Sequence, residues 1–221
     1  MSRRLVLLHR ALLAGGFLFG LASGALTAQA EPKDKAVGSK AMKAGGGELR
    51  AELRRLWEDH ALWTRLYIVT AAANHPAKDA TAARLLKNQE DLGNAIKPFY
   101  GDAAGSKLTE LLKTHIMIAT EIVDAAMKAE AAKKDDAVKR WGANADEIAT
   151  FLSGANPHWP LADLKAMLHE HLTLTTEEAV AELGKQWDAS IAAYDKVKAQ
   201  MLKMADALAS GIARQHPQKV H

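Results

Sequence analysis

Apolar residues recur at intervals of three and four from Glu48 to the C-terminal end of the chain. This spacing is typical of amphipathic helices, and no alternating run of β-branched residues indicates a strand. Prolines, glycines and a run of charged residues interrupt the pattern at five places. The sequence therefore predicts an all-α fold of six helices, over residues 48–73, 79–97, 106–128, 135–153, 161–183 and 186–214.

Three of these helices carry a histidine at the same position of the apolar stripe. His60, His115 and His171 lie 55 and 56 residues apart, and each has an apolar residue four positions before it. The following helices align on Asn88 and Asn144, with a weaker third copy. Because one helical hairpin cannot bury its own apolar stripe, several must pack together. The repeat predicts a six-helix bundle built from three repeated αα-hairpins.

The three histidines need polar partners if the bundle buries them. An imidazole buried without a hydrogen bond costs on the order of 1–3 kcal/mol. Asn88 and Asn144 lie on the stripes of the paired helices, with Asp91 and Glu147 one turn further along. These four side chains are the expected partners. The pattern favours either a polar layer that sets helix register or a ligand-binding site made of these residues and the histidines.

Metal binding is a further hypothesis for the same three histidines. Imidazole binds transition metals such as zinc, copper, nickel and iron. The spacings Glu-x-x-His and His-Glu-x-x-His are absent, so the hypothesis rests on His60, His115 and His171 alone. They can meet at one ion only if the three hairpins close around a common axis.

Glu58 and Asp59 directly precede His60 and are the acid–base candidates of the chain. Acidic residues near the start of a helix are also typical of a solvated face, where the helix dipole favours them. The sequence has no cysteine, no Gly-x-Ser-x-Gly motif and no glycine-rich phosphate loop. It therefore favours a non-enzymatic protein. An extracytoplasmic enzyme that uses Glu58, Asp59 and His60, or a purely structural scaffold, is the alternative.

The first 30 residues have the pattern of a secretory signal peptide. Arg3, Arg4 and Arg10 are followed by an apolar stretch that ends before the cleavage motif Ala28-Gln29-Ala30. That stretch is shorter than the ~20 residues that span a bilayer, so we expect cleavage near Ala30 and no membrane anchor afterwards. Residues 31–47 are rich in Lys, Ala and Gly and are expected to be a flexible linker before a bundle domain at 48–221. The predicted location is the periplasm or the exterior of the cell.

Cleavage of the first 30 residues would change the charge of the chain, and the lack of cysteine bears on how the remaining domain is stabilised. The chain has 29 Lys and Arg against 26 Asp and Glu, and residues 1–30 hold three arginines and no acid. The remaining residues are therefore balanced in charge, which gives no basic surface for nucleic acid. With no cysteine, the exported domain has no disulfide, and its core must stabilise it alone.

Several stretches resemble a family of small exported bacterial all-helical proteins. They include LWEDHALWTRLYIV, LLKNQEDLGNAIKPFYG, NADEIATFLSGANPHWP and MLHEHLTLTTEEAV, and the likeness covers about residues 50–217. The resemblance implies export and a helical fold, and it assigns no site residue. Members are sometimes named glycosyltransferases, but the sequence does not support that activity, because such enzymes usually need an α/β sheet.

As a whole, the sequence predicts a non-enzymatic helical bundle of the bacterial envelope. A small ligand, a metal or a protein partner would bind through the repeated layer of histidines and asparagines. Nucleic acid is not an expected partner.

Overall fold

The computed structural model describes residues 46–220. Over these residues the fold is all-helical, as the apolar spacing predicts. The helices are α1 (Gly46–Ala72), α2 (Lys78–Met127), α3 (Ala131–Ala155), α4 (Leu161–Leu183) and α5 (Trp187–Gln215), followed by the 3₁₀ helix η1 (Pro217–Lys219). The predicted signal peptide and nearly all of the predicted linker lie outside the described residues.

The expected count of six separate helices was wrong. Helix α2 covers 50 residues and takes the place of two expected helices. The break that Pro98 and the glycines indicated is reduced to one non-helical residue, Gly101, with φ 84° and ψ 169°. Glycine adopts positive φ without a steric penalty, so the chain changes direction there without a loop.

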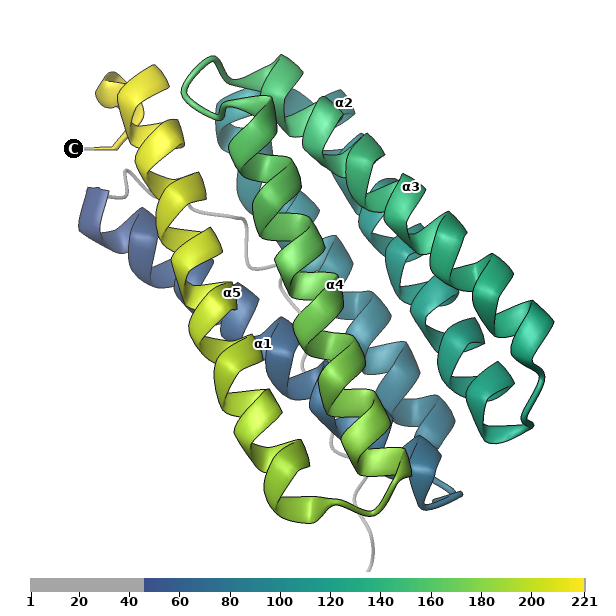
Figure 1. Cartoon of the computed structure of the whole chain (residues 1–221). Helices are drawn as coiled ribbons and strands as arrows, with labels where there is room; N and C mark the ends of the chain where they lie inside the picture. Colours follow the sequence, from purple (N-terminus) through teal and green to yellow (C-terminus); the bar gives the residue numbers. More distant parts are fainter. Residues whose placement is uncertain (1–45, 221) are drawn as a thin grey trace, which may run out of the picture. The chain divides into compact units, whose positions relative to one another are not determined.

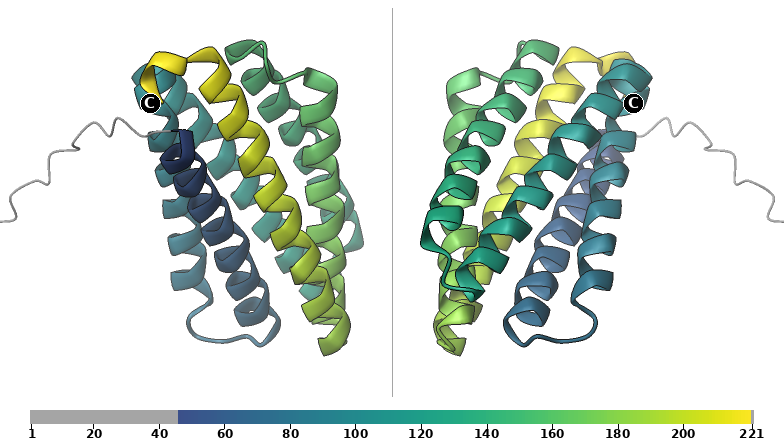
Figure 2. Two further views of the ribbon diagram at one scale, coloured as in Figure 1. Left: turned by 90° about the vertical axis from the view of Figure 1, so that its left-hand side faces the viewer. Right: turned by 90° about the vertical axis from the view of Figure 1, so that its right-hand side faces the viewer.

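The helices pack side by side (Figure 1). Helix α1 contacts α2 and α5, α3 contacts α2 and α4, and α4 contacts α5, which closes the bundle. The turns at residues 73–77, 128–130 and 184–186 lie at the same end in both views of Figure 2. None of the described helices is long and apolar enough to cross a membrane.

These three turns share one backbone conformation. Asn74, Ala129 and Lys185 have φ of 49°, 57° and 57°, and each lies 14 residues after one of the three histidines. The amide of the next residue donates to a carbonyl five positions earlier, in the pairs His75–Thr70 (2.8 Å), Glu130–Ala125 (2.9 Å) and Gln186–Ala181 (2.9 Å). This is the Schellman arrangement that commonly ends a helix, although glycine usually takes the left-handed position.

The main apolar core fills the end of the bundle away from these turns. It contains most of the buried leucines together with Trp57, Trp141 and Trp159. A smaller cluster lies nearer the turns and includes Tyr67, Ile68, Leu85, Ile116 and Val123. The two clusters divide the interior along the helix axes.

Replacing Ala129 by glycine should stabilise the fold. A side chain with a Cβ in the left-handed region costs about 1 kcal/mol, which glycine avoids. We expect Ala129→Gly to raise the free energy of unfolding in urea by about that amount. Ala192, exposed within α5, provides the control, since Ala192→Gly should lower the same free energy by about 0.5–1 kcal/mol. An unchanged or lower stability of Ala129→Gly would contradict the assigned turn.

Candidate functional site

The three histidines lie together inside the bundle. His60 on α1, His115 on α2 and His171 on α4 are 2%, 4% and 4% exposed. The ring centroids of His60 and His171 are 5.7 Å apart, and those of His171 and His115 are 6.2 Å apart. Trp57 packs 5.6 Å from His60, and Trp141 packs 5.1 Å from His115. Three segments far apart in sequence thus form one aromatic layer.

One amide side chain from a neighbouring helix anchors each histidine-bearing turn. In every case the side-chain nitrogen donates to the backbone carbonyl four residues before the histidine. The pairs are Asn88 to Leu56 (3.0 Å), Asn144 to Leu111 (3.2 Å) and Gln200 to Met167 (2.9 Å). Gln200 is therefore the third member of the set, which the weak sequence match had left uncertain.

The ring partners differ from one histidine to the next. Gln89 Nε2 donates to His60 Nδ1 at 3.2 Å, whereas His115 Nδ1 donates to Asn144 Oδ1 at 2.8 Å. His171 Nδ1 lies 3.4 Å from the hydroxyl of Thr175. All three rings use Nδ1, and among residues 46–220 no hydrogen bond joins the Nε2 atoms to the protein.

Burial keeps these rings uncharged. It lowers the pKa of His60 to about 4, and the neighbouring His115 adds to the effect. Burial also lowers the pKa of His115 to about 4, against the opposite influence of Asn144. The pKa of His171 falls well below its ordinary value, first through burial and then through the other two histidines. At neutral pH the layer consists of neutral imidazoles.

A cavity of about 260 Å³ extends from the histidines toward the turns. Helices α1, α2, α3 and α4 line it, and α5 does not. The wall is mainly apolar and includes Tyr67, Ile68, Leu85, Ile116, Ala119, Val123, Trp141, Ala179 and Leu183. The cavity opens to solvent between α3 and α4. The exposed lining residues there are Asp135 and Val138 of α3 and Thr176 and Val180 of α4.

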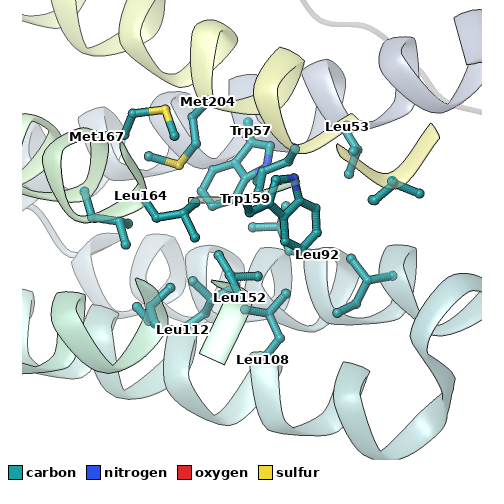
Figure 3. Close-up of a pocket in the computed structure, with 15 residues that line it drawn as sticks. Leu53, Trp57, Leu92, Leu108, Leu112, Leu152, Trp159, Leu164, Met167 and Met204 are labelled. Carbon is teal, nitrogen blue, oxygen red and sulfur yellow. The ribbon is translucent and has the colours of Figure 1, made fainter. Parts of the chain in front are cut away.

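The opposite side of the histidine layer is densely packed. The internal space among the leucines and tryptophans there measures about 30 Å³. Figure 3 shows its lining, with Trp57 and Trp159 at the centre and Leu53, Leu108 and Leu164 among the surrounding side chains. On α1, on α4 and on the half of α2 after Gly101, the residues before each histidine fill this packed end, and the residues after it line the cavity. The histidines therefore form the boundary between the packed core and the cavity.

A buried ionic cluster joins α1 to α4 and α5. Arg65 Nη1 is 3.3 Å from Glu178 Oε1, and Arg65 Nη2 is 3.1 Å from Glu182 Oε2. Ser190 Oγ contacts Arg65 and donates to Glu182 Oε2 at 2.5 Å. Burial raises the pKa of Glu178 to about 7, although Arg65 acts in the opposite direction. The cluster closes the corner of the bundle where α5 packs, beside the cavity-lining residue Thr64.

Two of the expected site residues do not reach the histidines. Asp91 pairs with Lys87 at 3.0 Å, Glu147 is exposed, and neither lines the cavity. On a helix with 3.6 residues per turn, a residue three positions on is rotated about 60° from the starting direction. Asp91 and Glu147 therefore turn outward from the stripe, while Asn88 and Asn144 stay on it. Of these two, only Asn144 bonds to a histidine ring, and Asn88 bonds to the carbonyl of Leu56 instead of His60.

The acid–base candidates also separate from their histidine. Glu58 pairs with Lys198 at 2.6 Å, and Asp59 pairs with Arg55 at 3.1 Å. Adjacent residues of a helix point about 100° apart, so these carboxylates face outward while His60 faces the core. The three side chains do not form one reactive group.

The described residues also lack a metal-binding arrangement. Between residues 46 and 220, no group of three or more His, Cys, Asp or Glu side chains is placed to hold an ion. The rings of His115 and His171 stack at an interplanar angle of 27°, and two Nδ1 atoms already bond to amides. This geometry favours hydrogen bonding over coordination.

Comparison with known proteins adds no relative to this picture. No family model, no curated protein and no solved structure matches the chain. The resemblance to exported helical proteins therefore stays a prediction.

The histidine layer should make stability depend on pH. The pKa of each ring is lower in the folded state than in the unfolded state, so the unfolded chain binds more protons below about pH 6.5. The stabilisation is complete above that pH and is lost as the pH falls toward 4, by about 1.4 kcal/mol per pH unit for each histidine. Urea unfolding between pH 7 and 5 measures the slope.

One variant and one control connect that slope to the layer. His115→Gln should reduce the number of protons taken up on unfolding by about one. His169→Gln removes an imidazole that is exposed on α4. It should change the slope of unfolding free energy against pH less than His115→Gln does. A wild-type free energy that is constant from pH 6.5 to 5 would contradict the burial of neutral rings.

Removal of Arg65 should destabilise the bundle strongly. Arg65→Met leaves the carboxylates of Glu178 and Glu182 buried without their cation, and breaking such a pair costs about 3–5 kcal/mol. Arg55→Met breaks exposed pairs with Glu52 and Asp59 and should cost far less. Thermal and urea unfolding of both variants measure the difference. Equal losses would show that the Arg65 cluster has no special role.

Proposed function

We propose that this protein is a non-enzymatic binding protein that holds a small, uncharged, mainly apolar molecule next to the histidine layer. One observation carries the proposal. A cavity of about 260 Å³ opens beside three neutral histidines, whereas the internal space in the core on their other side measures about 30 Å³. Binding pockets are usually mainly apolar, with a few polar groups that orient the ligand. The cavity wall has this composition.

The size of the cavity sets the size of the ligand. An apolar cavity of ~150 Å³ accommodates benzene. The larger cavity here suits a molecule with about ten non-hydrogen atoms. Neutral imidazoles supply no positive charge to an anion, and Lys134, the cation of the cavity wall, is paired with Asp135 at 3.3 Å. The proposed ligand is therefore uncharged.

A three-hairpin repeat explains why the histidines meet. The histidines, the left-handed turn residues and the anchoring amides all recur at intervals of 55 or 56 residues. On this interpretation α2 contains the second helix of one hairpin and the first helix of the next, divided at Gly101. Related hairpins that pack around one axis bring equivalent residues to one level.

The proposed site of action is the bacterial envelope or the exterior of the cell. This part of the proposal rests on the signal peptide expected at residues 1–30. A purely structural role would account for the amide-bonded histidines, but it would leave the cavity beside them without a purpose. An acid–base enzyme has less support, because Glu58 and Asp59 are paired at the surface.

Calorimetric titration with naphthalene tests the binding proposal. We expect one molecule to bind per chain. Ala119→Phe fills the cavity with a ring from its own wall, and it should weaken binding at least tenfold. Ala192→Phe adds the same ring to the exposed face of α5 and should leave the affinity unchanged. No saturable binding to the wild type, or equal binding to Ala119→Phe, would refute the proposal.

A further inference from the structure

We infer that the natural ligand carries a hydroxyl group, which donates a hydrogen bond to His115 Nε2 and accepts one from His60 Nε2. The ligand class is then a small alcohol or phenol with an apolar body. This inference rests on the proposed binding function and specifies the chemistry of the same cavity. It follows from the different ways in which the two rings are held.

The proton of His115 is located by Asn144. The amide nitrogen of Asn144 donates to the carbonyl of Leu111 at 3.2 Å, so its Oδ1 is the atom that faces the ring. An amide oxygen only accepts hydrogen bonds, and therefore His115 Nδ1 carries the proton. In a neutral imidazole the other nitrogen then has a free lone pair. His115 presents an acceptor, Nε2.

The proton of His60 is located on the opposite nitrogen. Gln89 Nε2 lies 3.2 Å from His60 Nδ1, 3.1 Å from Asn88 Oδ1 and 2.8 Å from the carbonyl of Leu85, so its two hydrogens are shared among three acceptors. An amide nitrogen only donates, and it can donate to the ring only if Nδ1 has no proton. The proton of the neutral ring is then on Nε2, and His60 presents a donor.

These two rings line the same cavity. A hydroxyl both donates and accepts, so it is the simplest group that matches a donor and an acceptor in one cavity. A ketone or an ether accepts only and would leave the lone pair of His115 without a donor. Thr64 adds a further polar atom to the wall, because its Oγ1 is buried and no hydrogen bond within the described residues reaches it.

Three probes of similar shape test the inference by calorimetry. Naphthalene has no polar group, 2-methoxynaphthalene only accepts, and 2-naphthol donates and accepts. We expect 2-naphthol to bind about tenfold more tightly than 2-methoxynaphthalene, which lacks one of the two hydrogen bonds, and more tightly still than naphthalene, which lacks both. His115→Phe should reduce the affinity for 2-naphthol to about that for 2-methoxynaphthalene, because only the hydrogen bond from His60 remains. His169→Phe, on the exposed face of α4, is the control and should preserve the preference.

The outcomes separate the two proposals. Equal binding of all three probes overturns the hydroxyl inference and leaves the binding function in place, whereas no binding of any probe overturns both. If His115→Phe does not fold, ¹⁵N chemical shifts of the wild-type rings decide the matter. They should place the proton of His115 on Nδ1 and that of His60 on Nε2, and the His115 Nε2 signal should move with 2-naphthol and not with naphthalene. The opposite protonation, or no movement, refutes the inference.

Discussion

The structure depends on the requirement that a buried imidazole be uncharged and hydrogen-bonded. Three such rings lie at one level of the bundle, where like charges would repel one another in a medium of low polarity. An amide from the paired helix meets this requirement for His60 and for His115. The amides of Asn88, Asn144 and Gln200 also bond to helix carbonyls, so they connect the paired helices at the level of the rings. The polar layer and the helix register are thus set by the same contacts.

The layer divides the interior into two parts with different packing. Leucines and tryptophans fill the side shown in Figure 3 nearly completely. On the other side smaller residues, such as Ala119 and Ala179, face the space between four helices. Empty apolar volume weakens a core, because the lining atoms lose contacts that they would otherwise make. A bundle that keeps such a volume next to polar groups has the features of a binding site.

The Arg65 cluster explains how the cavity end of the bundle holds together. Fewer apolar contacts are available there, since the smaller core cluster contains only six buried residues. Arg65, Glu178, Glu182 and Ser190 connect three helices at this corner. Buried ion pairs of this kind contribute little net stability but strongly disfavour arrangements that separate the partners. The cluster therefore helps to keep α5 against α1 and α4, while the opening lies between α3 and α4.

The sequence by itself determined the helical class of the described residues and the spacing of the three histidines, because helix periodicity is a property of consecutive residues. It also located the ends of the first helix of each pair. It did not indicate that these ends are left-handed turns, because Ala129 and Lys185 occupy positions where glycine is usual. Only the tertiary structure showed that the expected break between two helices is limited to one non-helical residue, Gly101. It also decided that Gln89, rather than the expected Asn88 or Asp91, bonds to His60. Partners and cavities depend on which side chains from different helices meet at one level and how much volume they fill, and no local pattern contains that information.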